Sequence, residues 1–371
     1  MGIYKNIAGT KITEMNVIDI NTSSPYKALV DRGLIDRAGE LIREHAALNA
    51  NAAIAAIITD DAVGPLYAGR VAASLEAAGF KPVVYTIPNG ESSKNIKSYA
   101  AVLEFLAENH VTRSDFIVAL GGGVIGDLAG FAAATFLRRI DFVQIPTTLL
   151  AAVDSSVGGK TGIDLEAGKN LAGAFYQPKL VICDMDCFDT LPDAVYTEGC
   201  AEIIKYGVLG DKELFNHLAK HGKDFDKEYV ISRCIEMKRD IVCKDEFDTG
   251  LRQLLNLGHT LGHAVEKLSN FDMYHGMAVA VGMAVVARAS AAQAVCSEET
   301  AERIVEVLKR FGLPTESKFN IDELYAVMQS DKKRRGGDIS VVVPTHIGAC
   351  EIVKMPLENM RSFMARGIVA T

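Results

Sequence analysis

Apolar runs alternate with amphipathic segments along the first half of the chain. The mostly apolar runs predict strands at 53–59, 82–87, 115–120 and 141–145. The segments between them predict helices at 64–79, 95–108 and 127–137. Strands with continuous apolar runs are typical of a parallel sheet whose two faces are both covered by helices. The first half therefore indicates a layered α/β arrangement.

The pattern changes near residue 190. From Pro192 to about Gln329 the pattern is helical, and one late β-like run follows at Ile339–Val343. A chain of 371 residues also exceeds the size at which one hydrophobic core usually stops growing. We therefore expect two domains, 1–188 and 189–371, with the boundary uncertain by several residues.

Composition narrows the possible classes of protein. The formal net charge of −8 argues against a nucleic-acid partner, because proteins that bind phosphate backbones usually present a basic face. The seven cysteines are irregularly spaced and form no CxxC pair, which is typical of reduced thiols in a cytoplasmic protein. The N-terminus does not resemble a signal peptide, and no apolar run is long enough for a membrane span. We expect a cytoplasmic protein with neither nucleic-acid nor membrane partners.

A glycine-rich loop follows the third strand and opens a helix: Gly121-Gly122-Gly123-Val124-Ile125-Gly126-Asp127. Glycines let backbone N–H groups approach a phosphate closely, and a helix N-terminus adds partial positive charge. The context differs from the usual dinucleotide fingerprint, because Asp141, twenty residues on, begins a strand instead of ending one. Asp60, at the end of the first strand, is the better candidate for ribose hydroxyls. The alternative is a tight turn that serves packing alone.

Further polar loops follow at 146–148, 154–162 and 168–170. Ligands of α/β sheets bind at the carboxyl ends of strands, so these loops predict one crevice. Lys160 and Lys169, each beside a glycine, are its candidate cations. The alternative for either lysine alone is a solvated surface residue.

Three histidines gather within a short stretch of the second half. His259 and His263 are four residues apart and share a face if the segment is helical. His275 follows, and Glu202 offers a carboxylate. Two imidazoles and one carboxylate with an open position suit catalytic Zn²⁺. The spacing does not fix which two histidines bind metal, and the remaining one is free for acid/base work.

Several cations accompany this histidine region in the sequence: Lys205, Lys238, Arg252 and the run at 331–335. An isolated charge run is usually a solvated face. Here the combination predicts a phosphorylated and carboxylated substrate, because arginine binds either group bidentately and lysine neutralises phosphate as a point charge.

Ordered strings of residues extend from residue 88 to residue 333: PNGESSK (88–94), GGGVIGD (121–127), PTTLLAAVDSSVGGKTG (146–162), GKNL (168–171), AEIIKYG (201–207), GLRQLLNLGHTLGHAVE (250–266), HGMAVAVGM (275–283) and DKK (331–333). Together they resemble the family of 3-dehydroquinate synthases, within the sugar phosphate cyclases. The resemblance implies a Rossmann-like parallel-sheet domain that binds NAD, followed by an all-helical domain that binds one divalent metal, Zn²⁺ or Co²⁺. The site lies in the cleft between them.

The resemblance also assigns roles to individual residues. Glu202, His259 and His275 match the metal ligands, and His263 matches the catalytic acid/base. Catalytic and substrate-contacting positions are matched by Asp154, Lys160, Asn170, Lys205, Lys238, Arg252, Asn256 and Lys333. NAD-contacting positions are matched by Asp60, Glu91, Lys94, Gly121, Gly122, Gly123, Asp127, Thr147, Thr148, Lys160 and Lys169. Arg138 matches an arginine that reaches the substrate phosphate of the neighbouring subunit, which implies a homodimer.

The chain departs from the family pattern at three positions. Met277 stands where glutamate is usual, Arg139 where glycine is common, and Asp248 where glutamate is common. None of these changes removes an expected ligand. Met277 does put in doubt the support of His275, because a metal-bound histidine is normally oriented by a hydrogen-bond partner.

The activity implied by the resemblance is conversion of 3-deoxy-D-arabino-heptulosonate 7-phosphate, a phosphorylated keto acid, to 3-dehydroquinate and phosphate. This step belongs to the shikimate pathway of aromatic amino acid biosynthesis. It combines transient oxidation by NAD, β-elimination of phosphate, re-reduction and an intramolecular aldol closure. Because NAD is regenerated in each turnover, the net reaction is that of a lyase.

Three other functions compete with this expectation. One is a sister cyclase that acts on another sugar phosphate, such as 2-deoxy-scyllo-inosose synthase on glucose 6-phosphate. Retention of Lys160, Arg252 and Asn256 argues against it. Another is a metal-dependent polyol dehydrogenase, which has less need of phosphate-binding cations. The last is a non-catalytic NAD-binding protein, which has no reason to keep the histidines together with Glu202.

Overall fold

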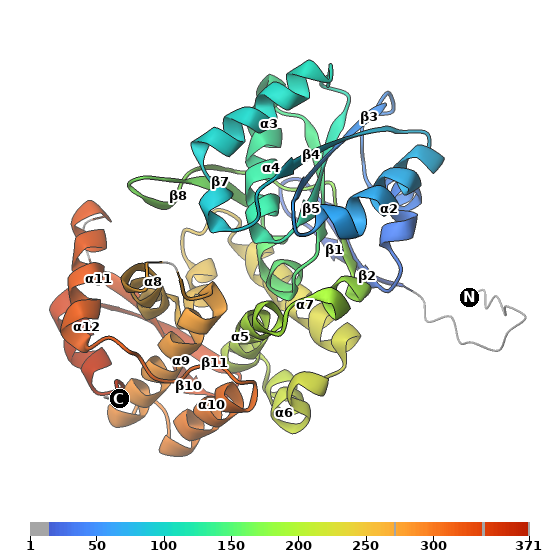
Figure 1. The fold of residues 1–371 in the computed structure, drawn as a ribbon. Helices are drawn as coiled ribbons and strands as arrows, with labels where there is room; N and C mark the ends of the chain where they lie inside the picture. Colours follow the sequence, from blue (N-terminus) through green and yellow to red (C-terminus); the bar gives the residue numbers. More distant parts are fainter. Residues whose placement is uncertain (1–14, 271, 336–337, 370–371) are drawn as a thin grey trace, which may run out of the picture.

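The chain folds into a part built on a sheet and a mainly helical part that follows it (Figure 1). This computed structural model describes residues 15–270, 272–335 and 338–369, with no side-chain description at 330–335. The chain leaves the sheet after β9 (Leu180–Asp184) and enters the helices at α5 (Asp193–Gly210). The α/β class expected from the sequence is confirmed.

The central sheet has seven strands in the order β1-β2-β9-β6-β5-β3-β4. β1 pairs with β2 in the antiparallel sense, and every other neighbouring pair is parallel. The predicted strands are β3 (Ile54–Asp60), β4 (Lys81–Ile87), β5 (Phe116–Gly121) and β6 (Asp141–Pro146). The hairpin of β1 (Asn16–Ile20) and β2 (Tyr26–Asp31) was not predicted.

Successive residues of the central strands point into two separate hydrophobic clusters. Ala55 and Ile57 of β3 join one cluster, and Ala56 and Ile58 join the other. The first is covered by α1 (Ala38–His45) and α2 (Gly64–Ala77), the second by α3 (Ile96–Glu108) and α4 (Gly123–Thr135). This burial on both faces explains why the strands read as continuous apolar runs.

The polar stretch after β6 forms a hairpin where the sequence indicated only loops. β7 (Lys160–Leu165) and β8 (Gly168–Phe175) pair in the antiparallel sense, and the hairpin projects on the side of the helical part where α8 lies (Figure 1). Gly162 and Gly173 let the two backbones approach, because a Cβ at either would overlap the opposite strand. Its glycines and polar residues conceal the strand pattern in the sequence.

The second part packs helices around a long apolar helix. Its helices are α5, α6 (Lys212–His221), α7 (Lys227–Lys244), α8 (His259–Leu268), α9 (His275–Ala292), α10 (Glu298–Arg310), α11 (Ile321–Arg335) and α12 (Leu357–Ala365). The β-like run is β10 (Ile339–His346), which pairs with β11 (Ala349–Met355), so this part is not wholly helical. α9 alone among the described helices is long and apolar enough for a membrane span, but 72% of it is buried, as expected for a core helix.

Candidate functional site

Three helices bring the expected metal ligands together, and glycines set how closely these helices pack. Gly276, the second residue of α9, lies against α5, where a Cβ atom would overlap the Glu198 carbonyl. Gly282 lies equally close to Gly258, the N-cap of α8. α9 therefore contacts both neighbouring helices at backbone distance, which brings Glu202 of α5, His259 of α8 and His275 of α9 to one point.

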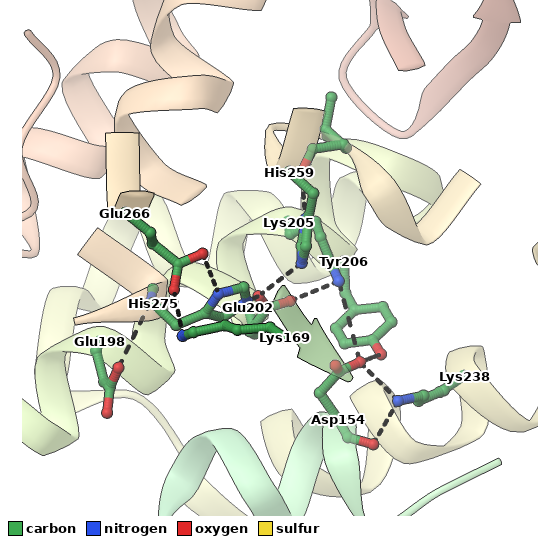
Figure 2. Close-up of polar contacts among 12 residues, drawn as sticks. Asp154, Lys169, Glu198, Glu202, Lys205, Tyr206, Lys238, His259, Glu266 and His275 are labelled. Atoms are coloured by element: carbon green, nitrogen blue, oxygen red, sulfur yellow. Dashed lines mark hydrogen bonds and ion pairs between the residues drawn. The ribbon is translucent and has the colours of Figure 1, made fainter. Parts of the chain in front are cut away.

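The three side chains, called the metal cluster below, face one another (Figure 2). Glu202 Oε1 lies 3.6 Å from His259 Nε2 and 3.7 Å from His275 Nε2. One ligand atom from each residue lies within 4.8 Å of the others. Nitrogen and carboxylate ligands at this spacing fit a divalent ion such as Zn²⁺ or Co²⁺.

The carboxylate of Glu202 is buried without full satisfaction of its oxygens. Among the described residues neither oxygen has a hydrogen-bond partner of acceptable geometry, although Lys205 Nζ forms an ion pair with Oε2 at 2.5 Å. An unsatisfied buried carboxylate costs several kcal/mol unless a cation or donor meets it. The unsatisfied Oε1, which faces two imidazole nitrogens, therefore fits a bound metal ion.

The two histidines of the cluster present Nε2 to this point because their other ring nitrogen is engaged. His259 Nδ1 lies 3.1 Å from the Leu257 carbonyl, and His275 Nδ1 lies 3.2 Å from Glu266 Oε2. Burial, together with Lys205, lowers the pKa of His259 well below its usual value, so this imidazole is neutral, as a metal ligand must be. Burial also lowers the pKa of His275, but Glu266 outweighs it and the net pKa is raised.

Glu266 supplies the hydrogen-bond partner that Met277 put in doubt. Met277 packs against the hydrophobic core, and the carboxylate comes from α8 instead. His263, Glu266 and His275 also form a second possible metal-binding set. Glu266 already contacts both His275 and Lys169, so the metal cluster with its unsatisfied Glu202 is the better site.

His263 lies beside the metal cluster but remains exposed to solvent. Its ring centroid is 5.6 Å from that of His259 and 6.0 Å from that of His275. A histidine in this position can exchange protons with solvent next to a bound metal, as a general acid or base requires.

Asp154 is the centre of a buried network that joins the two parts of the chain. It follows β6, and its Oδ1 accepts hydrogen bonds from Lys238 Nζ and from Tyr206 Oη, each at 2.8 Å. Lys238 Nζ also donates to the backbone carbonyl of Asp154, and Lys205 Nζ lies 4.0 Å from Asp154 Oδ1. Burial raises the pKa of Asp154, but Lys238 and Lys205 outweigh it and hold this pKa well below its usual value.

Other expected cations are also paired within the protein. Lys160 Nζ lies 2.5 Å from Asp248 Oδ2. Lys169 Nζ lies 3.3 Å from both Glu91 Oε1 and Glu266 Oε1. The carboxylates of Asp248 and Glu266 belong to the helical part, so both lysines connect the β7–β8 hairpin to it.

Two further cations lie deeper in the molecule. Lys94 Nζ donates to Asp127 Oδ2 and to Asn170 Oδ1, each at 2.6 Å. Arg252 is buried and donates to the Gly158 and Glu246 carbonyls at 3.0 and 2.6 Å. The cations Lys94, Lys160, Lys169, Lys205, Lys238 and Arg252, called the paired cations below, thus all contact acceptors of the protein itself.

The glycine loop lies at the carboxyl end of β5, where the sequence indicated a phosphate site. Gly121 ends β5, Gly122 is the N-cap of α4, and Gly123 is its first residue. As glycine, Gly122 has no side chain to cap the first N–H groups, which leaves them to an anion or to water. Thr147 and Thr148 follow β6 beside this loop, and the Thr147 N–H donates to the Gly121 carbonyl.

Asp60 ends β3, and its Oδ1 accepts hydrogen bonds from the N–H groups of Ala62 and Val63. Arg138 lies beyond the opposite end of α4, roughly 20 Å from the glycine loop at 1.5 Å per helical residue. Asn256 is exposed at the end of a short 3-10 helix. Lys333 lies on α11, but its side chain is outside the described part of the chain.

The departure at Arg139 falls where the backbone favours glycine. Arg139 has φ of 125°, and Leu137 and Arg138 also have positive φ. Positive φ is costly for residues that carry a Cβ atom. Glycine, common here in the family pattern, suits this conformation better.

Sequence reasoning missed three residues that contribute to the site: Tyr206, Glu198 and Glu266. Glu266 follows His259 by seven residues and His263 by three, so helical spacing alone places it on their face. Glu198 precedes Glu202 by one turn, and its Oε2 accepts from the Gly276 N–H at 3.5 Å. Burial raises the pKa of Glu198 to about 7.

The fold and site define an α/β enzyme with a candidate divalent-metal centre beside the paired cations. Residues 84–198 match the family model described as 3-dehydroquinate synthase N-terminal, and residues 199–334 match the one described as 3-dehydroquinate synthase C-terminal. A curated 3-dehydroquinate synthase of Streptococcus suis is 43% identical over 349 residues, 92% of this chain and 97% of that protein. The chain therefore belongs to the 3-dehydroquinate synthase family.

Two solved structures have a similar fold. The 2-epi-5-epi-valiolone synthase of Streptomyces hygroscopicus subsp. jinggangensis, with NAD⁺ and Zn²⁺ bound, is 26% identical. Its TM-score is 0.83, over 91% of this chain and 95% of that one. A 2-deoxy-scyllo-inosose synthase complexed with carbaglucose-6-phosphate, NAD⁺ and Co²⁺ has a TM-score of 0.84 at 21% identity, over 95% and 100% of the chains. At 21% identity, the similarity to the 2-deoxy-scyllo-inosose synthase shows a shared fold.

Proposed function

We propose that this chain is an NAD- and metal-dependent 3-dehydroquinate synthase of the shikimate pathway. It converts 3-deoxy-D-arabino-heptulosonate 7-phosphate to 3-dehydroquinate and phosphate. The observation that carries the proposal is the metal cluster, in which a buried, unsatisfied Glu202 oxygen faces two imidazoles beside the paired cations. The names of the curated relatives support the same activity.

In this proposal the two parts divide the work. Residues 1–188 bind NAD, and residues 189–371 carry the metal and much of the substrate site. One Zn²⁺ or Co²⁺ is held by Glu202, His259 and His275, in line with the ions in the two solved relatives. When bound, the metal supplies Lewis-acid polarisation of substrate hydroxyl oxygens.

The chain's own side chains then bind the substrate and move its protons. His263 takes the proton from the substrate hydroxyl, because it lies beside the cluster and reaches solvent. Asp154 orients hydroxyl groups and is held in place by its network. The phosphate and carboxylate of the substrate are bound by side chains from both the sheet part and the helical part of the chain: Lys160, Asn170, Lys205, Lys238, Arg252, Asn256 and Lys333.

The cofactor site uses the carboxyl edge of the sheet. Gly121, Gly122 and Gly123 approach the pyrophosphate at the N-terminus of α4. Asp60 binds the ribose, and the nearby contacts come from Glu91, Lys94, Asp127, Thr147, Thr148, Lys160 and Lys169. The reaction returns NAD to its starting state, so the protein has to hold the cofactor without releasing it as NADH.

The proposed assembly is a cytoplasmic homodimer. Arg138 lies roughly 20 Å from the glycine loop of its own chain, on the far side of α4. The family resemblance gives Arg138 a role at the substrate phosphate of a neighbouring copy, which is the basis for proposing a dimer. Sedimentation of wild-type protein and Arg138→Ala tests the dimer, while phosphate release tests the role of the side chain.

The activity is tested by phosphate release from 3-deoxy-D-arabino-heptulosonate 7-phosphate with catalytic NAD⁺ and Zn²⁺. We expect release without net NADH, and loss of release on chelation. Release from glucose 6-phosphate instead would assign the chain to a sister cyclase. Accumulation of NADH without phosphate would assign it to the polyol dehydrogenases.

A further inference from the structure

Glu266 is a buried carboxylate that contacts both parts of the molecule (Figure 2). Its Oε2 lies 3.2 Å from His275 Nδ1, on the ring edge opposite to the metal cluster. Its Oε1 lies 3.3 Å from Lys169 Nζ on β8. One side chain thus connects a metal ligand of α9 with the hairpin of the sheet part.

The contact with His275 determines which ring nitrogen is available to metal. A carboxylate that accepts from Nδ1–H keeps the proton on Nδ1 and leaves the Nε2 lone pair directed at Glu202. It also holds the ring plane, because a metal site needs ligands within about 0.5 Å of their working positions. The usual glutamate after His275-Gly276 is replaced by Met277, whose side chain packs in the core.

Lys169 keeps Glu266 in this position. The ion pair between Lys169 Nζ and Glu266 Oε1, at 3.3 Å, holds one carboxylate oxygen and leaves the other directed at His275 Nδ1. Lys169 is itself held by Glu91, so the chain of contacts runs from Glu91 through Lys169 and Glu266 to His275. Glu266 is thus the described contact through which Lys169 reaches His275.

We propose that Glu266 is a positioning residue that orients His275 for metal binding and links this ligand, through Lys169, to the β7–β8 hairpin. The inference rests on the proposed metal site. It makes metal affinity depend on a lysine of the opposite part of the molecule.

The first test measures Zn²⁺ affinity of the whole chain by competition with a chromogenic chelator. We expect Glu266→Gln to weaken binding about 10- to 100-fold, because lost outer-shell partners have this effect on other metal sites. Glu266→Asp, which keeps the charge, should recover part of the affinity. Glu306→Gln, the same change on the exposed face of α10, should leave it unchanged. The absorption bands of Co²⁺-loaded Glu266→Gln should shift, because the geometry at His275 changes.

The second test is a double-mutant cycle with Lys169→Met, again with Zn²⁺ and without NAD⁺. We expect Lys169→Met alone to weaken binding about three- to tenfold, a coupling of about 1 kcal/mol. The double variant with Glu266→Gln should bind no more weakly than Glu266→Gln alone. Additive effects would overturn the link through Glu266.

Glu202→Gln separates this inference from the proposed function. If Glu202→Gln abolishes Zn²⁺ binding while Glu266→Gln leaves affinity unchanged, the metal site stands and the positioning role is wrong. If Glu202→Gln binds as wild type and Glu266→Gln does not bind, Glu266 is itself a ligand, and both the site and the inference are wrong.

Discussion

The metal cluster and the paired cations differ in how far the protein itself satisfies them. In the metal cluster, Glu202 Oε1 lacks a hydrogen-bond donor among the described residues. Each of the paired cations instead contacts an acceptor of the protein. The metal cluster is therefore preorganised for an ion, whereas an anionic ligand has to exchange places with existing partners.

This difference predicts different responses to mutation. Removing a ligand of the metal cluster should abolish ion binding at that cluster. Removing a cation leaves its acidic partner unpaired, so the cost appears in stability as well as in binding. The predictions below separate these two responses, beginning with the largest effect.

His259→Ala should lower phosphate release by about 10³-fold or more, because metal polarisation supplies several kcal/mol and each 1.36 kcal/mol is about tenfold. Its unfolding temperature without metal should stay near that of wild type. His221→Ala, an exposed histidine on α6, serves as the matched control. Near-normal activity of His259→Ala with added Zn²⁺ would contradict the assignment of the ligand.

Lys94→Met should lower the free energy of unfolding by about 3 kcal/mol, because it leaves Asp127 buried without its cation. The exposed neighbour Lys97, changed to methionine, should cost less than about 0.5 kcal/mol. Urea unfolding of both variants provides the measurement. Equal free energies of unfolding for the two variants would mean that the Lys94–Asp127 ion pair does not stabilise the fold.

The pH dependence of kcat/KM and of stability should reflect the ionisation of Lys238. Burial lowers its pKa to about 8, although Asp154 opposes this shift. Above that pH the lysine loses its charge, so kcat/KM should fall about tenfold per pH unit. The unfolded value is 10.5, so between pH 8 and 10.5 the unfolded chain binds more protons and the stability owed to Lys238 rises with pH.

Lys238→Met provides the comparison for this pH profile. The variant should lack the fall in kcat/KM near pH 8. Its stability deficit relative to wild type should grow between pH 8 and 10.5, where wild type gains stability from the neutral lysine. A fall near pH 8 that persists in the variant would have to come from another group.

Asp248→Asn should have the smallest effect. Asp248 holds Lys160, whose side chain is 52% exposed, so the pair contributes no more than about 1 kcal/mol. Releasing Lys160 should lower KM for the phosphorylated substrate about two- to fivefold. Asp240→Asn, an exposed change on α7, is the control. A raised KM would show that Asp248 helps to position Lys160.

The sequence predicted β3 to β6 but not β9, although all five residues of β9 are buried. β3, β5 and β6 stand out because their residues are buried in both hydrophobic clusters, whereas β4, at the edge of the sheet, contributes only to the second cluster and stands out by its apolar composition. The β1–β2 and β7–β8 hairpins did not stand out, since short, polar or glycine-containing strands lack a continuous apolar run. β11 was missed for the same reason, although its partner β10 was recognised.

Those residues of the site that are marked by helical spacing or by the strings resembling the family were predictable from the sequence. His259 and His263 are one helical turn apart, and the strings singled out Glu202 and His275. The partner of His275 was not predictable, because it depends on how α8 packs against α9 through Gly258 and Gly282. The internal pairs of Lys160 and Lys169 are likewise long-range contacts that no local pattern encodes.

The most direct test of the preorganised metal cluster is anomalous diffraction at the zinc edge from crystals of the Zn²⁺-loaded protein. We predict one strong peak between Glu202 Oε1, His259 Nε2 and His275 Nε2, with Glu266 still on His275 Nδ1. A peak among His263, Glu266 and His275, or none within reach of Glu202, would contradict the account.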